Sequence, residues 1–357
     1  MKITALIMAG GKGERFWPKS RANCPKQFID ITGCGKTMLQ LTAERILPLT
    51  SIEDIYIVTN ADYSELVAEQ LPYVPKENIL CEPVGRNTAP CIGLGAAHIL
   101  KRNADAVVLV LAADHLIKQE EDFRSVLREA IVVAEQGENV VTIGITPDRP
   151  ETNYGYIKRG KEAQEGHAAI VEKFVEKPNL QTAIRYLQSG NYLWNSGIFV
   201  WKASTIMALL QQYLPDIYRH IRKIGDGIGS PQEFEIIKEE FSAMRSVSVD
   251  YGIMEYAENL YVLAGTFGWD DVGSWLALER IKDKDSEGNL INGNIVKTGT
   301  KNCIIEGGEK LIATVGLDDV VIIDTQDVVL VADKQHIGDI KNVLEEIRIN
   351  RLEEKYL

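Results

Sequence analysis

The chain has 357 residues, 45% of them hydrophobic and 25% charged, with a formal net charge of −12. These values are ordinary for a soluble globular protein, and the acidic charge argues against nonspecific binding of nucleic acid. No apolar stretch is long enough to span a membrane, and the first apolar run is too short for a signal-peptide core. We therefore expect neither a membrane partner nor a cleaved leader.

Buried strands alternate with amphipathic helices over the first 145 residues. Continuous apolar runs predict strands at 3–9, 55–59, 106–113 and 140–145. Helical spacing of apolar positions predicts helices at 38–47, 64–71, 88–102 and 122–136. This alternation predicts an open α/β sheet with helices on its faces, in which ligands bind beyond the carboxyl ends of the strands. Functional residues are therefore expected just after Ala9, Thr59 and Ala113.

The pattern changes near residue 289. Five short strand-like runs follow at 294–297, 302–306, 311–315, 320–324 and 328–332, and an amphipathic helix begins at about Gln335. Short strands at this regular spacing predict a small β-helix-like appendage. We place the boundary in the polar linker near 285–288. The chain then divides into a catalytic domain at 1–285 and a C-terminal domain at 286–357, which we expect to serve assembly.

The five cysteines form no C-x-x-C pair, and an odd number is untypical of a disulfide framework. They predict free thiols in a reducing compartment, which favours a cytoplasmic location. They are Cys24, Cys34, Cys81, Cys91 and Cys303.

Three glycines, Gly10, Gly11 and Gly13, follow the first strand within four residues. Glycines at such a position let the backbone approach a ligand and turn its N–H groups toward it. Residues 1–36 also carry seven Lys or Arg against two acids, which suits binding of phosphates. The alternative is a glycine turn on an ordinary charged surface. The bases of the loop are Lys12, Arg15, Lys19, Arg21 and Lys26.

The sequence of this segment does not match two other phosphate-binding motifs. A dinucleotide fingerprint that starts at Gly11 needs a small residue at position 16, which is Phe16. A Walker A loop that ends in Gly35-Lys36-Thr37 needs glycine at position 30, which is Asp30.

Several motifs in order along residues 3–280 resemble those of the nucleotide-sugar pyrophosphorylases. The first is Gly10-Gly11-x-Gly13-x-Arg15-x-Trp17-Pro18-x-Ser20-Arg21, followed by Pro25-Lys26-Gln27. Its Trp-Pro-x-Ser-Arg part is most similar to the mannose-1-phosphate guanylyltransferase branch. The later motifs are Glu82-Pro83-x-x-Arg86-Asn87-Thr88, Ala113-Asp114-His115, Asn153-Tyr154-Gly155, Val175-Glu176-Lys177-Pro178, Asn195-Ser196-Gly197 and Gly268-Trp269-Asp270-Asp271.

The resemblance implies a Rossmann-like mixed sheet in a homodimeric enzyme. It also implies a Mg²⁺-dependent transfer of GMP from GTP to mannose 1-phosphate. Some members carry a further isomerase domain, which we do not expect in a chain of this length. The alternatives are a relative that uses another sugar or base, and a non-catalytic regulatory subunit. By resemblance the catalytic residues are Arg15, Lys26, Asp114 and Asp271.

The same resemblance implies two sets of binding residues. The nucleotide-binding set is Ala9, Gly10, Gly11, Gly13, Arg15, Glu82, Asn87 and Thr88. The set that binds the sugar phosphate is Tyr154, Gly155, Glu176, Lys177, Asn195 and Gly197.

The carboxylates of these sets also have physical interpretations of their own. Glu82 can accept hydrogen bonds from the two adjacent donors of guanine, or it is a solvated glutamate before a proline turn. Asp114 is either a magnesium ligand with Asp271 or the N-cap of a helix. Glu176 and Lys177 contact the sugar phosphate, or form only a salt bridge at a strand edge. Asp270 competes with Asp271 for the metal, and the sequence leaves this choice open.

Overall fold

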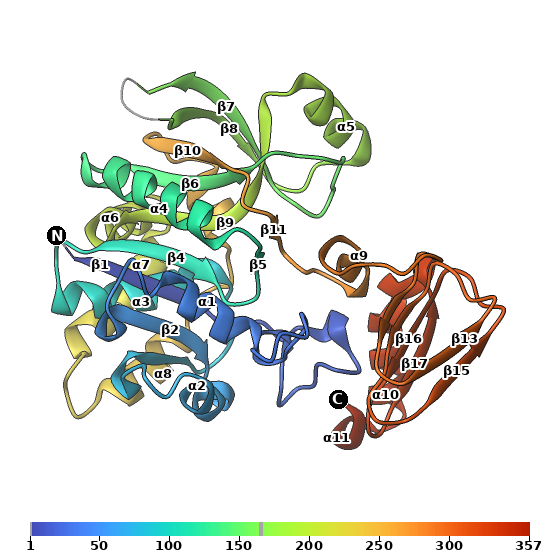
Figure 1. Cartoon of the computed structure of the whole chain (residues 1–357). Coiled ribbons are helices and arrows are strands. Elements are labelled where there is room, and N and C mark those ends of the chain that lie inside the picture. Colours follow the sequence, from blue (N-terminus) through green and yellow to red (C-terminus); the bar gives the residue numbers. More distant parts are fainter. Residues whose placement is uncertain (1, 164–166) are drawn as a thin grey trace. The chain divides into compact units, whose positions relative to one another are not determined.

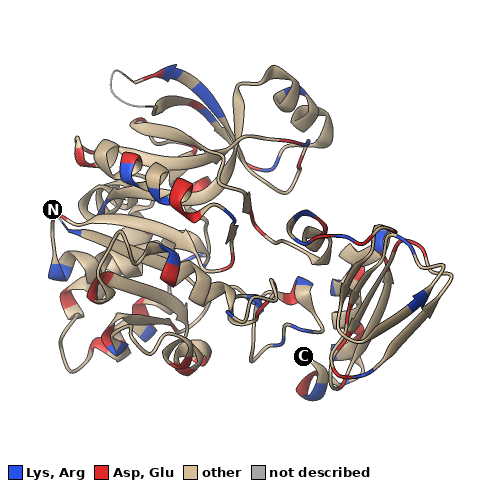
Figure 2. Cartoon of the chain, in the orientation of Figure 1, with Lys and Arg blue, Asp and Glu red and all other residues tan. Residues whose placement is uncertain are grey.

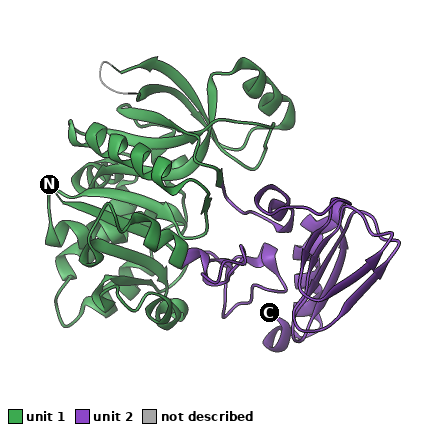
Figure 3. Cartoon of the chain, viewed as in Figure 1, with its two compact units in different colours: residues 1–10, 40–269 green, residues 11–39, 270–357 purple. Residues whose placement is uncertain are grey.

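The computed structural model describes residues 2–163 and 167–357. They form two compact units (Figure 3). Unit 1 comprises Met1–Gly10 and Gln40–Trp269, and unit 2 comprises Gly11–Leu39 and Asp270–Leu357. The glycine loop after the first strand therefore belongs with the C-terminal residues. The boundary predicted at 285–288 follows the polar linker in the sequence, whereas the two units are defined by contacts in space. That boundary therefore stays a prediction.

Unit 1 is built on a sheet with nine strands among the described residues, in the order β3-β2-β1-β4-β9-β6-β10-β8-β7 (Figure 1). β1, β2, β3 and β4 are parallel, as are β6 and β10, whereas β9 runs antiparallel to both β4 and β6. The expected mixed sheet is thus confirmed. The strands are β1 (Ile3–Met8), β2 (Ile55–Asn60), β3 (Ile79–Glu82), β4 (Val107–Ala112), β6 (Val140–Ile145), β7 (Tyr156–Glu162), β8 (Ala169–Val175), β9 (Tyr192–Lys202) and β10 (Leu260–Gly265), with a short β5 (Leu116–Ile117) outside this sheet.

The four strands and four helices predicted for the first 145 residues are confirmed, with ends that differ by at most two residues. Their patterns were readable because β1, β4 and β6 are buried on both faces. The long strand β9 was not predicted, since its sequence mixes polar and aromatic residues. The helices are α1 (Met38–Ile46), α2 (Ser64–Gln70), α3 (Thr88–Arg102), α4 (Glu120–Glu135), α5 (Leu180–Ser189), α6 (Ala203–Tyr213), α7 (Pro215–Gly227) and α8 (Glu233–Ser242).

Alternate residues of the central strands meet different helices. Leu6 of β1 lies against Gly95 of α3, where any larger residue would overlap the leucine side chain. On β4, Val110 belongs to the same core as α3, α6 and α7, while Leu111 lies beside Phe123 of α4. The sheet is therefore covered on both faces. The charged residues of its strands lie mainly on β7 and β8, whereas β1, β2, β4 and β6 carry none (Figure 2).

Unit 2 contains the glycine loop and the predicted short strands. β14 pairs with β12 and β16 in parallel, β13 pairs with β15 in parallel, and β17 pairs with β16 in antiparallel orientation. All five predicted runs are confirmed as strands, and β12 is an addition. The elements are β11 (Trp269–Asp270), at the boundary of the two units, α9 (Leu278–Ile281), β12 (Leu290–Asn292), β13 (Ile295–Thr298), β14 (Ile304–Glu306), β15 (Ile312–Val315), β16 (Val320–Asp324), β17 (Val329–Asp333), α10 (Ile340–Ile349) and α11 (Glu353–Tyr356).

Among the residues that the structure describes, no helix is both long and apolar enough to cross a membrane.

Candidate active site

Glu82 ends β3 with its carboxylate buried beside Gly10. The residue is 5% exposed, and its Oε1 has no hydrogen-bond partner among residues 2–163 and 167–357. A Cβ built on Gly10 would lie 2.8 Å from Glu82 Oε2, so only glycine leaves the space in front of the carboxylate open. Burial raises the pKa of Glu82 to about 7, against a hydrogen bond from the Cys91 thiol that lowers it.

This arrangement excludes a solvated surface glutamate. An unpaired buried acceptor costs about 1–3 kcal/mol, and that cost is recovered only when a donor arrives. A carboxyl group with a strongly shifted pKa beside an open glycine is typical of a binding site. Its acceptors suit a ligand that presents N–H donors.

Asn87 and Thr88 form the start of α3. Asn87 has a φ of 70° and a ψ of −174°, a strained conformation that residues other than glycine rarely adopt. Its Oδ1 accepts the N–H of Thr88 at 2.8 Å, and Thr88 Oγ1 accepts the N–H of Val249 at 2.8 Å. Both side chains therefore hold the helix start in place, in addition to any contact with a nucleotide.

A second group of polar residues lies where β8 and β9 meet the loop before β7. Asn195 of β9 donates from Nδ2 to Asp250 Oδ1 at 2.8 Å and accepts the N–H of Gly197 at 3.0 Å. Its backbone N–H donates to Gly155 O at 2.8 Å. A Cβ on Gly155 would collide with Glu176 Oε2. The structure thus brings together the glutamate, the asparagine and the glycine that the motifs proposed for the sugar.

Glu176 lies next to Asp250, and only one of its two carboxylate oxygens has a partner among the described residues. Its Oε2 is buried and has no hydrogen-bond partner among the described residues, while Lys177 Nζ lies 3.3 Å from Oε1. Burial raises the pKa of Glu176, and the charge of Asp250 raises it further. Desolvation also raises the pKa of Asp250. The salt bridge with Lys177 exists, but it leaves one carboxylate oxygen available to a ligand hydroxyl.

Sequence reasoning missed Asp250. It lies in a π-helical turn at Asp250–Met254, and its hydrogen bond with Asn195 places it in this group.

Tyr154 is the buried wall of this group. It is 7% exposed and makes edge-on contacts with Trp194 and Trp269, with ring centroids 5.3 and 5.2 Å apart. Trp269 Nε1 donates to His115 Nδ1 at 3.2 Å, which requires a His115 ring with an unprotonated Nδ1. The aromatic residues therefore connect the predicted sugar group to the residue that follows Asp114.

Asp114 lies in the turn between β4 and β5, partly exposed. The next helix, α4, begins at Glu120, so Asp114 is not a helix N-cap. Thr42 of α1 donates to the carbonyl of Ala113 at 3.2 Å and supports the turn from behind.

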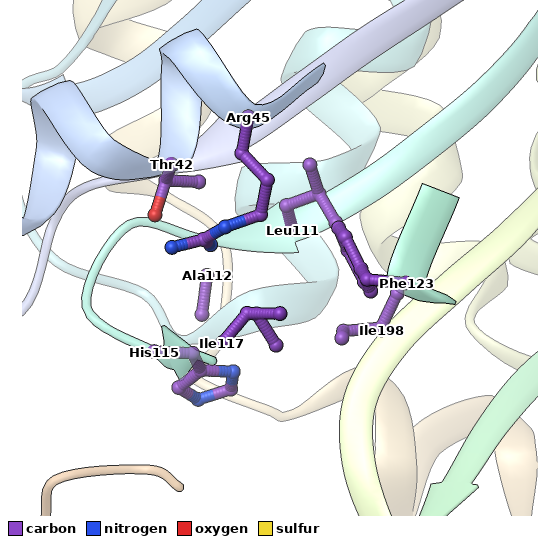
Figure 4. Close-up of a pocket in the computed structure, with 8 residues that line it drawn as sticks. All are labelled: Thr42, Arg45, Leu111, Ala112, His115, Ile117, Phe123 and Ile198. Carbon is purple, nitrogen blue, oxygen red and sulfur yellow. The ribbon is translucent and has the colours of Figure 1, made fainter. Parts of the chain in front are cut away.

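A small cavity borders this turn (Figure 4). Its volume is about 10 Å³, room for about one water molecule, which is far too small for a nucleotide. Arg45 enters it from α1, and burial lowers the pKa of this guanidinium to about 10 against the charge of Glu120. The cavity is lined by Thr42, Arg45, Leu111, Ala112, His115, Ile117, Phe123 and Ile198.

In unit 2 the glycine loop folds back on Lys26. Gly13 has a φ of 61°, and a Cβ there would lie 2.5 Å from the backbone N of Lys26. Ser20 Oγ donates to Gly13 O at 2.8 Å, and Gln27 Nε2 donates to Gly11 O at 2.9 Å. The glycine is therefore required both for its backbone conformation and for lack of space.

Lys26 and Arg15 both reach the segment at 271–273. Lys26 is 5% exposed, and its Nζ donates to Asp271 O at 2.6 Å. Arg15 is exposed and donates to Gly273 O at 3.3 Å. Three of the four proposed catalytic residues thus lie together in this unit.

The two tandem aspartates have different surroundings. Asp270 is 7% exposed, forms a bidentate pair with Arg280 at 2.6 and 2.9 Å, and accepts the N–H of Val272. Asp271 Oδ1 accepts a long bond of 3.2 Å from Gly273 N in its own turn, among other interactions of the residue. Arg280 therefore occupies both oxygens of Asp270, and this ion pair would have to break before Asp270 could bind another cation.

Comparison with known proteins identifies the family. The model of the nucleotidyl transferase family matches residues 4–288, and that of a MannoseP isomerase/GMP-like beta-helix domain matches 293–347. The chain belongs to the nucleotidyl transferase family. The resemblance seen in the motifs and the expected β-helix-like appendage are confirmed.

Proteins of similar sequence and a solved structure agree with this family assignment. A putative mannose-1-phosphate guanylyltransferase of Vibrio cholerae serotype O1 is 44% identical over 98% of this chain and 75% of its own length. The mannose-1-phosphate guanylyltransferase of Escherichia coli K12 is 42% identical over 97% of this chain and 74% of its own. A crystal structure described as mannose-1-phosphate geranyltransferase from Thermus thermophilus superposes with a TM-score of 0.88 at 37% identity, over 98% of this chain and 100% of that one.

Single substitutions of the two aspartates should separate structure from chemistry. Asp271→Asn should lower turnover by at least ~10²-fold, the scale of losing one key electrostatic stabiliser, with little change in Tm. Asp270→Asn should lower Tm, because Arg280 loses its partner, and should affect turnover much less. Turnover at saturating magnesium and thermal unfolding of both variants test this; a larger loss of turnover in Asp270→Asn would overturn the assignment.

The raised pKa of Glu82 predicts how stability depends on pH. The folded pKa lies above that of an ordinary glutamate, so folding favours the protonated form, and the carboxyl group destabilises the ligand-free protein as pH rises from about 4.5 to about 7. Glu82→Gln removes this cost. Its Tm should therefore exceed that of the wild type at pH 8 and match it near pH 4.5. The exposed Glu69 of α2, changed to Gln, is the control, and a difference in Tm independent of pH would contradict the expectation.

Proposed function

We propose that this chain transfers GMP from GTP to mannose 1-phosphate and releases pyrophosphate and GDP-mannose. The observation that carries the choice of base is the buried, unpaired oxygen of Glu82 beside Gly10. Guanine offers N1–H and an amino group on one edge, and a carboxylate accepts both. Adenine and uracil offer no such pair of neighbouring donors.

The reaction needs positioning and charge neutralisation more than acid–base chemistry. A phosphate oxygen of the sugar phosphate attacks the α-phosphorus of GTP; the new O–P bond forms as the bond to the bridging oxygen of pyrophosphate breaks. The nucleophile is already an anion at neutral pH, so no proton has to be removed. Holding two anions in line is the main requirement in such transfers.

The residues take roles that fit their surroundings. Arg15 and the N–H groups of the glycine loop bind the departing phosphates, and Lys26 with Lys177 binds the attacking phosphate. Glu176 and Asn195 accept and donate hydrogen bonds to the sugar hydroxyls, with Tyr154 as the wall. Asn87 and Thr88 present the N-terminal end of α3 to the nucleotide.

Asp114 and Asp271 are proposed to hold Mg²⁺, which would neutralise phosphate charge. Their carboxylates fit this ion, since magnesium takes one or two protein oxygens and fills its remaining positions with phosphate and water. The described residues contain no cluster of three or more His, Cys, Asp or Glu that could hold a metal.

Two further properties belong to the proposal. The C-terminal domain supports a homodimer, because β17 is an edge strand with Val329 and Val331 59% and 64% exposed. A cytoplasmic location is supported by five free cysteines, two of them buried.

The test of this function is release of pyrophosphate. The purified chain should release it with GTP and mannose 1-phosphate and not with either alone, and EDTA should stop the reaction until Mg²⁺ is restored. Glucose 1-phosphate, and ATP or UTP in place of GTP, form the comparison panel. Faster release with another sugar or base would replace the proposed substrates, and no release with any pair would favour a non-catalytic binding protein.

Base selection should depend on Glu82. In Glu82→Gln an NH₂ group faces one of the guanine donors, and the mismatch in a partly solvated site costs ~2 kcal/mol, or about thirtyfold in kcat/KM for GTP. Use of ATP should change little. The measurement is the ratio of kcat/KM for GTP to that for ATP at fixed mannose 1-phosphate, with Glu69→Gln as the control. A ratio within twofold of the wild type would show that Glu82 does not read the base.

A further inference from the structure

The glycine loop is fastened to the C-terminal strands by a buried carboxylate. Glu306, at the end of β14, is 3% exposed. Its Oε2 lies 2.7 Å from Lys19 Nζ, in the middle of the loop, and its Oε1 lies 2.8 Å from Lys282 Nζ. Asn292 Nδ2 donates to Oε2 at 3.0 Å. Each oxygen of the buried Glu306 carboxylate therefore pairs with a lysine, and one of these lysines, Lys19, belongs to residues 11–39.

The charges in this cluster compensate one another. Burial alone would raise the pKa of Glu306, but the charge of Lys19 and the hydrogen bonds from Lys19, Lys282 and Asn292 lower it below its ordinary value. The carboxylate therefore stays ionised when Lys19 is bound. Removal of one partner from a buried ion pair is costly, because the remaining charge stays desolvated and loses part of its compensation; without Lys19, only Lys282 would still pair with the carboxylate. The loop is thus held by an interaction that weakens sharply if it moves away.

A second set of contacts holds the same loop. Trp17 Nε1 donates to Tyr356 O at 2.8 Å, and Trp275 Nε1 donates to Trp17 O at 3.0 Å. Arg21 forms an ion pair with Asp327 at 2.8 Å. These partners come from α11, from the turn before α9 and from the turn after β16, so several elements of unit 2 meet the loop between Gly13 and Lys26.

We infer that Glu306 is a positioning residue for nucleotidyl transfer. It holds Lys19, and through the short stretch from Gly13 to Lys26 it keeps Arg15 and Lys26 in their places beside residues 271–273. The C-terminal strands thereby act on the chemistry as well as on assembly. The inference rests on the proposed role of the glycine loop in binding GTP.

Glu306→Gln tests it, with Asp324→Asn as the matched control. Asp324 is also a nearly buried carboxylate of this domain, 7% exposed, and its lysine partner, Lys310 at 3.0 Å, lies outside the loop. Both variants should lower Tm. Only Glu306→Gln should raise hydrogen exchange within 11–39 and lower kcat/KM for GTP, by about tenfold, since small misplacements of catalytic groups have effects of this size or larger.

Lys19→Met covers the case in which Glu306→Gln does not fold, because it removes the same contact from the loop side and should give the same kinetic loss. Where both single variants fold, a double-mutant cycle applies, and the double variant should show little loss beyond that of either single variant. The inference would be overturned if the losses of kcat/KM in the two single variants added up in the double variant. Equal values of kcat/KM for Glu306→Gln and Asp324→Asn would overturn it as well.

Arg15→Ala separates this inference from the proposed function. If Arg15→Ala loses most activity while Glu306→Gln and Lys19→Met match the wild type, the positioning role is wrong and the loop remains the nucleotide site. If Arg15→Ala is fully active, the proposed nucleotide site itself is wrong, and the positioning role of Glu306 is wrong with it.

Discussion

Close packing of glycine against charged side chains is the constraint on which the candidate site depends. The space that a Cβ would fill is taken by Glu82 at Gly10, by Lys26 at Gly13, by Glu176 at Gly155 and by Asp271 at Gly273. At Gly10, Gly155 and Gly273 the nearest atom is a carboxylate oxygen, and at Gly13 the nearest atoms are the backbone N and the Cβ of Lys26. A methyl group at any of these glycines would displace the neighbouring residue, because close-packed interiors have no room to absorb it.

The buried carboxylates fall into two groups that differ in their partners. Asp270 and Glu306 have cations or N–H groups on both oxygens, which is the pattern of residues that hold a structure together. Glu82 and Glu176 each keep a buried oxygen without a hydrogen-bond partner among the described residues, and burial raises the pKa of both. Folding tolerates such groups at a cost in stability, and ligand binding is the event that recovers it.

The chain also distributes the proposed roles between two compact units. The groups proposed to read the base and the sugar belong to unit 1, where β3, β8 and β9 end. The bases proposed for the departing phosphates belong to unit 2, with residues 270–357. A loop rich in glycine has little rigidity of its own, so its fixed shape has to come from contacts such as those of Lys19 with Glu306.

The alternating strands and helices of the first 145 residues, the short C-terminal strands and the family could all be predicted from the sequence, because periodicity and local motifs are properties of neighbouring residues. Tertiary structure decided what depends on distant partners. Arg280 occupies both oxygens of Asp270, an ion pair that the tandem aspartates of the sequence do not reveal and that supports the proposal of Asp271 as the metal ligand. Burial made Glu82 an unpaired acceptor instead of a surface charge, and the hydrogen bond to Asn195 brought Asp250 into the site. The attachment of the glycine loop to Glu306 joins residues 287 positions apart, and no local pattern encodes such a contact.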